Sequence, residues 1–175
     1  MQFQGYVRQD GRVGVRNTVL VLAICDCGEP AARQMAEGIP GAVAVTHYHG
    51  CIALEVVPTI VGVCINPNIH GVVLVVMGCE GQRPEPIAEQ IAKSGKPVEI
   101  INIQEIGNTR QAIARGRSMV TALAQAAAAE RRVTVDISKL AVGVKCGGSD
   151  ASSGIAANPA IGVMSDMMVD AGARV

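Results

Sequence analysis

Short apolar runs rich in β-branched residues recur along the chain, and each is followed by a longer segment of mixed polarity. Residues 18–24 (TVLVLAI) and 71–77 (GVVLVVM) are continuous apolar runs, which is typical of strands covered on both faces. Weaker runs of the same kind complete the set of predicted strands, which covers residues 18–24, 42–46, 71–77, 98–103 and 140–144. Buried strands of this type predict a mostly parallel sheet.

The segments between these runs predict helices. The clearest is residues 108–131, an alanine-rich stretch whose last two residues are arginines, which stabilise the negative end of a helix dipole. Residues 86–94 also predict a helix, because Gly95 and Pro97 stop the pattern. The predicted helices cover residues 29–37, 53–64, 86–94, 108–131 and 159–171. The valine and isoleucine content of residues 53–64 is also compatible with a strand.

Strand and helix alternate throughout, which predicts parallel strands joined by right-handed crossovers. We therefore expect the α/β class, with a Rossmann-like, doubly wound, mostly parallel sheet of about five strands. Residues 1–17 would form an N-terminal arm and residues 18–175 the α/β domain. Residues 172–175 look like the beginning of a further strand, so we expect the domain to be a fragment of a larger catalytic region.

Composition and charge exclude several classes of protein. Of the 175 residues, 49% are hydrophobic and 17% charged, which excludes a disordered chain and a coiled coil. Fifteen basic residues balance fifteen acidic ones and aromatic residues make up 2%, so we expect no nucleic-acid binding. The sequence shows no signal peptide and no apolar run long enough for a membrane span, so we expect a cytoplasmic protein without a membrane partner. The high apolar content predicts a homo-oligomer.

Six cysteines, at positions 25, 27, 51, 64, 79 and 146, are interpreted as reduced thiols, because a cytoplasmic protein is expected. No pair of them has zinc-finger spacing. A free cysteine is often only a small buried hydrophobic residue, and Cys64 and Cys25 fit that interpretation. Cys51, Cys79 and Cys146 each neighbour a glycine in a polar turn. For these three, a ligand or catalytic role and a structural role are about equally supported.

Side chains capable of chemistry follow every predicted strand. Ligands of open α/β sheets bind beyond the carboxyl ends of the strands, where these side chains would meet. They are Cys25, Asp26 and Cys27, then His47, His49 and Cys51, then Cys79 and Glu80, then Gln104 and Glu105, and finally Cys146, Ser149 and Asp150. Imidazole and thiolate suit iron or zinc, and we expect a metal site at this edge rather than plain surface loops.

Two further segments carry polar groups. The glycines after Cys146 would let backbone N–H groups approach an anion, with Ser149 and Ser153 as added donors. The alternative is a tight turn in which Asp150 caps the next helix, and Asn158 before a proline fits the cap of the last helix. Residues 5–17 hold three arginines, which either bind carboxylates or form a solvated arm. The chain contains neither a Walker loop nor a GxGxxG fingerprint.

An ordered set of segments resembles the altronate/galactarate dehydratase family of hydro-lyases, whose relatives include the large subunit of sulfolactate sulfo-lyase. The segments are GYVRQDGRVGVRN, HYHGC, NPN, GCE, IQEIGNTRQAIARG and CGGSDASSGIAANPAIG. The resemblance begins at Gly5 and runs to the end of the chain. It implies dependence on Fe²⁺ or another divalent metal. It also implies two partners, the remaining part of the catalytic chain and a small accessory domain or subunit.

The resemblance further implies a small hydroxy acid as substrate and a role for each residue carried over. The implied metal ligands are His47, Cys51, Cys79 and Cys146. The predicted catalytic residues are Glu80 and Asp150, which the resemblance carries over, and His49, which is proposed from the HYHGC segment itself. The implied substrate-binding residues are Arg12, Arg16, Asn17, Ser149, Ser153 and Asn158. Family members that act on sugar acids tend to have Gly-Thr where this chain has Tyr48 and His49, so the resemblance indicates the reaction class rather than the substrate.

The implied reaction is a β-elimination. A base removes the proton α to the carboxylate, a metal ion assists the departure of water from the β carbon, and the enol becomes a 2-keto-3-deoxy acid. The alternative within the family is elimination of sulfite from sulfolactate. Two alternatives from other classes are a non-catalytic assembly domain and a nucleotide-binding Rossmann module. The missing glycine fingerprint counts against the last of these.

Overall fold

The computed structural model describes residues 1–48, 50–51, 54–81 and 83–175, so the predicted catalytic residue His49 lies outside the described residues. The chain consists of two compact units. The larger is Tyr6–Arg131, and the smaller combines Met1–Gly5 with Arg132–Val175. The predicted division into an arm of residues 1–17 and a domain of residues 18–175 stays a prediction.

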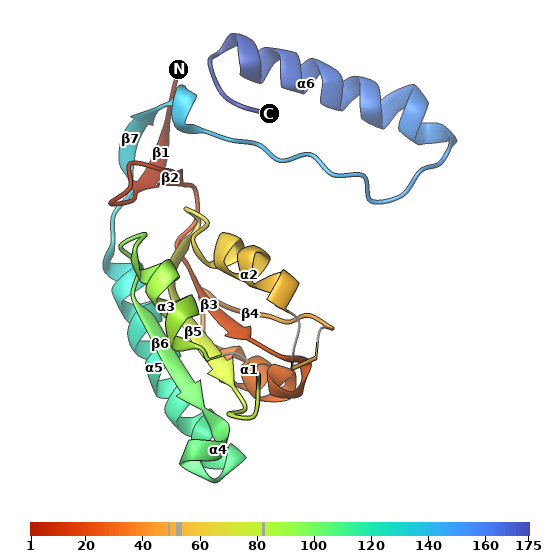
Figure 1. The fold of residues 1–175 in the computed structure, drawn as a ribbon. Helices are drawn as coiled ribbons and strands as arrows, with labels where there is room; N and C mark the ends of the chain where they lie inside the picture. The colour runs from red at the N-terminus through yellow and green to blue at the C-terminus, as the bar shows by residue number, and fades with distance from the viewer. Residues whose placement is uncertain (49, 52–53, 82) are drawn as a thin grey trace. The chain divides into compact units, whose positions relative to one another are not determined.

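A four-stranded parallel sheet in the order β4-β3-β5-β6 forms the centre of the larger unit (Figure 1). The strands are β3 (Thr18–Ala23), β4 (Ala42–Val45), β5 (Ile69–Val76) and β6 (Val98–Asn102). β3 comes first in the chain and lies inside the sheet, so the connections run outward in both directions from the gap between β3 and β5. This is the doubly wound arrangement, and the predicted Rossmann-like α/β class is confirmed with four strands instead of about five.

The prediction of a strand at residues 140–144 was wrong. All of these residues are described, and among them only Ala141 makes a β-bridge, with Arg174. They lie in the smaller unit and most of their side chains are exposed. Gly143 also interrupts the short apolar run, which weakens a strand.

Helices cover both faces of the sheet. α1 (Glu29–Ala36) and α5 (Thr109–Ala129) pack on one face, and α2 (Val57–Cys64) and α3 (Glu85–Ala92) on the other (Figure 1). Successive β3 side chains alternate between the two cores, because a strand turns every second side chain to the same face. Val19 and Val21 join the core under α1 and α5, whereas Leu20 and Leu22 join the core under α2 and α3.

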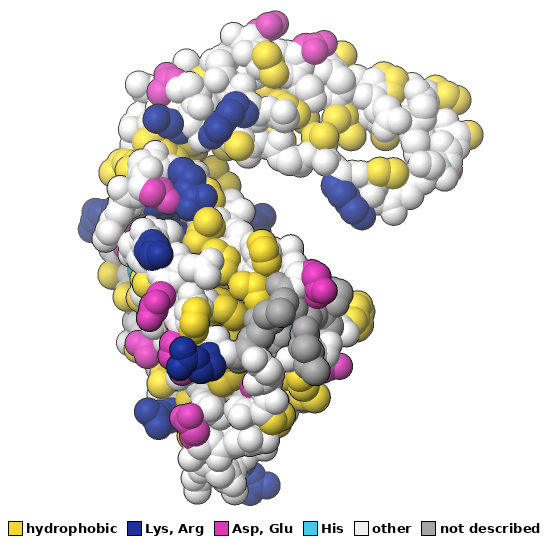
Figure 2. All heavy atoms as spheres, in the orientation of Figure 1, with side chains coloured by type: hydrophobic (Ala, Val, Ile, Leu, Met, Phe, Trp, Pro, Cys, Tyr) yellow, Lys and Arg dark blue, Asp and Glu magenta, His cyan; other side chains and the backbone are white. Residues whose placement is uncertain are grey.

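The surface over α2 and α3 is apolar. A groove of about 840 Å³ is lined by Val57, Val61, Ile65, Pro86 and Ile87, among others. Figure 2 shows hydrophobic side chains gathered over these two helices. None of the described helices is long and apolar enough to cross a membrane.

Strand β1 (Gln2–Val7) takes part in both units. Its residues Tyr6 and Val7 pair with β2 (Val13–Gly14) in a hairpin of the larger unit. The turn of this hairpin includes Gly11, whose φ of 77° lies in the left-handed region. The remainder of β1 pairs antiparallel with β7 (Val133–Asp136) in the smaller unit, from Gln2 opposite Asp136 to Gly5 opposite Val133.

The smaller unit ends in α6 (Asn158–Asp170), none of whose residues is buried. A π-helical turn, Ser153–Ala157, runs directly into it. The interpretation of Asn158 as a helix cap was therefore wrong, because the residue before it already has helical backbone angles.

Candidate functional site

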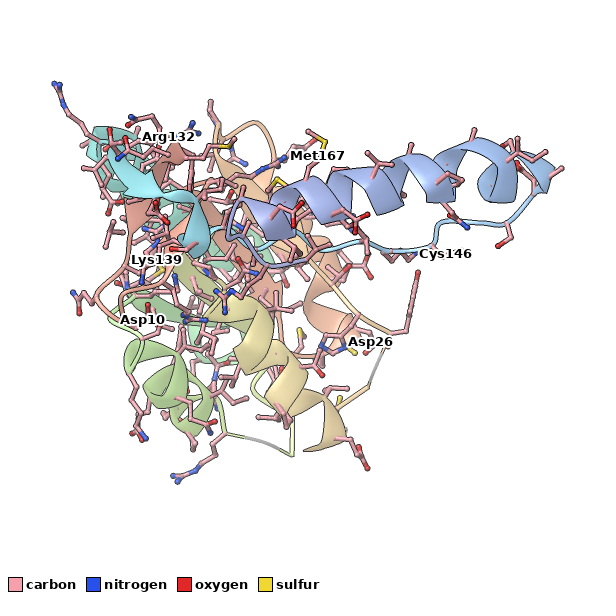
Figure 3. All side chains as sticks on the ribbon, turned by 90° about the horizontal axis from the view of Figure 1, so that it is seen from above. Asp10, Asp26, Arg132, Lys139, Cys146 and Met167 are labelled. Carbon is pink, nitrogen blue, oxygen red and sulfur yellow. The ribbon has the colours of Figure 1, made fainter. Side chains whose placement is uncertain are left out.

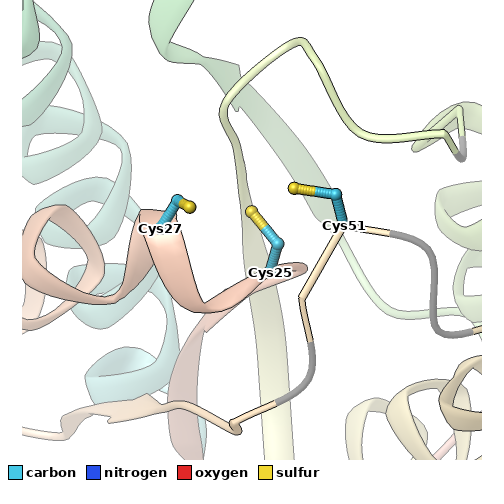
Figure 4. Close-up of side chains that lie close together, drawn as sticks. All are labelled: Cys25, Cys27 and Cys51. Carbon is cyan, nitrogen blue, oxygen red and sulfur yellow. The ribbon is translucent and has the colours of Figure 1, made fainter.

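Three cysteines converge at the carboxyl edge of the parallel sheet. Cys25 follows β3, Cys27 lies two residues further in a 3₁₀ turn (Asp26–Gly28), and Cys51 lies on the segment after β4. Their sulfur atoms all lie within 4.8 Å of one another, and Figure 4 shows them turned toward a common region. The position is at the carboxyl end of β3, beside the switch point between β3 and β5, which is where open α/β sheets bind ligands.

The local sequence explains why two of these thiols lie on one short turn. Cys25 has extended backbone angles (φ −132°, ψ 161°), and the Gly28 N–H donates to its carbonyl oxygen at 3.1 Å. Gly28 is buried, and a Cβ there would lie 3.4 Å from the side chain of Ala23. α1 begins immediately afterwards, with Pro30 in its first turn. Both thiols therefore lie just before the N-terminus of α1.

Glu80 borders the thiol cluster from the loop after β5. Its Oε1 accepts hydrogen bonds from the Cys25 thiol (3.3 Å) and from the Met77 N–H (2.5 Å). Its Oε2 accepts from the N–H of Gly78 at 2.7 Å. Burial raises the pKa of Glu80, but the hydrogen bonds from these backbone groups outweigh it and hold the pKa below the ordinary value. The carboxyl group is therefore ionised at neutral pH.

The thiols differ in burial and in pKa. Cys25 is buried, Cys51 is half-buried and Cys27 is exposed. Burial, together with the hydrogen bond to Glu80, raises the pKa of Cys25 to about 12. The Asp26 carboxylate beside Cys27 raises the pKa of that thiol as well. Without a bound cation, both groups are protonated at neutral pH.

Of the four predicted metal ligands, the structure places only Cys51 in this cluster. His47 lines a separate pocket of about 280 Å³ together with Leu22 and Ile60. Cys79 is exposed on the loop beside Glu80. Cys146 lies in the smaller unit on the extended segment before α6, with its sulfur 3.7 Å from Ser149 Oγ (Figure 3). It was predicted at this edge on the strength of a fifth strand that does not form.

Cys25 and Cys27 were missing from the predicted ligand set. Their signal in the sequence was their position directly after the strongest apolar run, where the carboxyl-edge rule applies most firmly. A buried thiol and a ligand thiol look alike in a sequence, because the direction of a side chain is set by the turn that follows the strand. Cys64, by contrast, is fully buried in the core under α2 and α3, as predicted.

Asp150 and Ser153, two predicted site residues of the smaller unit, hydrogen-bond at the start of the helical segment that leads into α6. Asp150 Oδ1 accepts from the backbone N–H groups of Ser152 (2.8 Å) and Ser153 (3.1 Å). The Ser152 hydroxyl also donates to it, and these bonds lower the pKa of Asp150. The Ser153 hydroxyl accepts from the Asp150 N–H at 3.1 Å. This geometry is that of the capping interpretation, and the catalytic and substrate-binding roles of these residues stay predictions.

The arginine segment lies at the opposite, amino edge of the sheet. Arg12 donates to the Ile65 carbonyl at 2.7 Å and pairs with Asp10 at 2.7 Å. Asn17 precedes β3, accepting from Arg8 (2.7 Å) and donating to the Ala127 carbonyl (2.8 Å). β3 has six residues, so its two ends are separated by roughly 20 Å. The larger unit therefore does not bring Arg12 and Asn17 to the thiol cluster.

Arg16 takes part in the same amino-edge network through its backbone. Its N–H donates to Asn68 Oδ1 at 3.0 Å, and its carbonyl accepts from Arg8 at 3.2 Å. The role of Arg12, Arg16 and Asn17 as carboxylate ligands stays a prediction.

A partly buried charged cluster, which sequence reasoning missed, lies at this amino edge. His70 Nδ1 is 3.0 Å from Glu130 Oε1, and the other carboxylate oxygen of Glu130 accepts from Asn17 at 2.9 Å. Burial lowers the pKa of His70 in spite of this carboxylate. Lys96 is 6% exposed and donates to the Ile69 carbonyl. Burial, reinforced by the charges of Arg8 and Arg12, lowers the pKa of Lys96 to about 8.

Comparison with known proteins identifies related sequences along nearly the whole chain. The family model described as D-galactarate dehydratase/altronate hydrolase, second domain, matches residues 5–128. The model described as D-galactarate/altronate dehydratase, C-terminal, matches residues 137–175.

The curated relatives are longer than this chain. The (2R)-sulfolactate sulfo-lyase subunit beta of Chromohalobacter salexigens is 35% identical over 97% of the chain and 44% of its own length. The galactarate dehydratase (L-threo-forming) of Escherichia coli is 32% identical over 99% of the chain and 38% of its own length. The altronate dehydratase of Bacillus subtilis is 27% identical over 97% and 37%. The chain spans less than half of each relative, and it belongs to the D-galactarate dehydratase/altronate hydrolase family.

Proposed function

We propose that the chain is part of a hydro-lyase that eliminates water from a sugar acid such as altronate or galactarate and yields a 2-keto-3-deoxy acid. The observation that carries the proposal is the family match over residues 5–128 and 137–175. The names of the altronate and galactarate dehydratases among its relatives supply the substrate class. The thiol cluster and Glu80 at the switch point supply polar groups where a substrate would bind.

A second candidate is the elimination of sulfite from sulfolactate. The sulfo-lyase subunit is 35% identical to the chain, whereas the two altronate dehydratases are 27% and 28% identical. Both reactions remove the proton α to a carboxylate and expel a group from the β carbon. The enol that forms then takes up a proton at the β carbon and becomes a 2-oxo acid. The two candidates differ in the leaving group, which is water in one and sulfite in the other.

A divalent ion, Fe²⁺ or a similar metal, fits the donor set at the carboxyl edge. Three thiols and a carboxylate within one short region match the preference of borderline ions for sulfur ligands. Cys25, Cys27 and Cys51 would hold such an ion. When bound, the ion would act as a Lewis acid toward the leaving group or the substrate carboxylate.

The residues of the chain itself would orient the substrate and accept its proton. We assign Glu80 as the general base, because its carboxylate borders the cluster and is held in place by the N–H groups of Met77 and Gly78. Ile24 and Cys25 are buried, so the floor of the site excludes water where β3 ends. The substrate carboxylate would need a positive partner, which Arg12 does not supply within the larger unit because it lies at the opposite edge of the sheet.

The active site would be completed by further protein. The chain spans 37% to 44% of its relatives, and one relative is named as a subunit beta. We therefore propose the remaining part of the catalytic region, or a second subunit, as the partner of this chain, within a homo-oligomer.

An elimination assay tests the proposal. The protein, purified without oxygen and loaded with Fe²⁺, is supplied with altronate, galactarate and sulfolactate. Each acid is assayed with and without the C-terminal region of the Bacillus subtilis altronate dehydratase, and the intact dehydratase is the positive control. Formation of a 2-keto-3-deoxy acid from altronate or galactarate supports the proposal. Release of sulfite from sulfolactate alone favours the second candidate, and no product in any arm refutes both.

A further inference from the structure

The three cysteines at the carboxyl edge can act together as one ligand set. Cys25 and Cys27 come from the turn after β3, and Cys51 comes from the segment after β4, so the set joins two neighbouring strands of the sheet. Their sulfur atoms lie within 4.8 Å of one another. Among the described residues, this is the one group of three or more histidine, cysteine or acidic residues whose ligand atoms lie so close together.

We propose that Cys25, Cys27 and Cys51 bind a single borderline divalent ion, such as Fe²⁺, Zn²⁺ or Co²⁺, through three thiolates, and that its fourth position is open. This differs from the ligand set implied by the resemblance, of which only Cys51 is retained. The inference deepens the proposed function, because it names the metal site on which that function rests. It is tested by metal binding alone, so its failure is distinguishable from failure of the elimination reaction.

The sulfur separations fit one ion. Thiolates bound to a tetrahedral ion at about 2.3 Å lie about 3.8 Å apart, and no two can exceed about 4.6 Å. The sulfur atoms lie within 4.8 Å of one another, so small side-chain rotations would bring them to the separation that one ion requires. In a [4Fe–4S] cluster each cysteine binds a different iron, so the sulfur atoms must stand further apart than in this arrangement.

Three protein ligands leave one coordination position for water or substrate, which is the pattern of catalytic rather than structural metal sites. The proton of each thiol passes to solvent on binding, so one dication and three thiols give a complex with a net charge of minus one. Glu80 borders the site through Cys25 Sγ at 3.3 Å and is itself fixed by two backbone N–H groups. The carboxylate accepts from Cys25 only while that thiol is protonated, and it raises the pKa of Cys25, so this hydrogen bond belongs to the metal-free chain.

Cobalt(II) is the probe for the first test. The full chain is reduced, kept free of oxygen and titrated with Co²⁺, and the thiolate-to-cobalt charge-transfer absorption is recorded. We expect saturation at one ion per chain. Cys27→Ser and Cys51→Ser should each weaken Co²⁺ binding by more than 100-fold, because each removes a direct ligand. Loss of a residue that only contacts a ligand costs about 10- to 100-fold. Cys79→Ser and Cys146→Ser are the matched controls, because the resemblance implies them as ligands, and they should bind Co²⁺ as the parent does.

The remaining outcomes overturn the inference. Loss of cobalt binding in Cys79→Ser or Cys146→Ser, or no charge-transfer band in the parent chain, refutes the ligand set. Reconstitution with iron and sulfide to four irons per chain refutes the single ion. Cys25 is buried, so Cys25→Ser could disturb the fold. Its cobalt titration is used only if its circular dichroism spectrum matches that of the parent. X-ray absorption of the zinc-loaded parent needs no variant, and it should show three sulfur neighbours at about 2.3 Å.

Discussion

Lys96 is a buried cation whose contribution to stability should depend on pH. It is 6% exposed, and its ammonium group faces the charges of Arg8, Arg12, Asp10 and Glu130. The perturbation is Lys96→Met, which keeps an unbranched side chain and removes the charge. We expect the substitution to remove a stability increase that the parent protein shows between neutral and alkaline pH.

The magnitude follows from the displaced pKa. Burial lowers the pKa of Lys96 from 10.5 to about 8. Below about pH 8 the lysine is charged in both the folded and the unfolded chain, so the folded state bears the whole cost of burying the charge. As pH rises from about 8 to 10.5, the folded chain loses its proton while the unfolded chain keeps it. The parent should therefore gain about 3 kcal/mol over this interval, at about 1.36 kcal/mol per pH unit.

The assay is urea denaturation of the parent and of Lys96→Met, followed by circular dichroism at about pH 7 and about pH 10.5. The difference between the two proteins at each pH cancels the titration of every other group. Lys93→Met is the matched control, since Lys93 is an exposed lysine on the same segment. Its difference from the parent should not change with pH. If the difference in free energy of unfolding between the parent and Lys96→Met also stays constant between the two pH values, within about 0.5 kcal/mol, the reasoning is refuted.

Four other substitutions test the packing, a helix cap and a partly buried histidine. Gly116→Ala should destabilise the protein by about 1–3 kcal/mol in urea, because the new Cβ would lie 2.4 Å from Met35 Sδ. Gly62→Ala, in open space on α2, should instead stabilise it by about 0.5–1 kcal/mol, and equal effects at both sites would contradict the contact. Asn108→Ala removes the N-cap of α5 and should cost about 1 kcal/mol, seen as a lower Tm; an unchanged Tm would argue against the cap. His70→Gln should flatten the loss of stability below about pH 6.5, because burial lowers the pKa of His70 and the folded state resists its protonation. Thermal melting from pH 7 downward measures this, and parallel curves for parent and variant would contradict it.

The central sheet could be predicted because its signal is local. β3 and β5 are buried on both faces, so their sequences are continuous apolar runs that need no knowledge of the partner strand. β1 and β7 were missed, because they pair across 130 residues and most of their side chains are exposed. Residues 140–144 were assigned a strand on apolar content alone. That content cannot decide whether a partner strand is available.

The candidate site could be predicted in its location but not in its members. The carboxyl-edge rule placed Cys51 and Glu80 correctly, since both follow strands that form. The same rule gives no position for Cys146, because the strand predicted before it does not form, and its role as a ligand stays a prediction. Cys25 and Cys27 belong to the cluster and Cys79 does not. This difference depends on side-chain direction within short turns, which residue type and spacing do not determine.

The continuous burial of β3 and β5 on both faces also determines how their backbone exchanges with solvent. Val19 to Leu22 and Val72 to Val75 are at most 2% exposed, so their backbone amides can exchange hydrogen with solvent only when the whole sheet separates. The 3₁₀ turn after β3 lies outside these strands and can open in a smaller cooperative unit. Ligand entry at the carboxyl edge can therefore rearrange this turn while the sheet beneath it keeps its register.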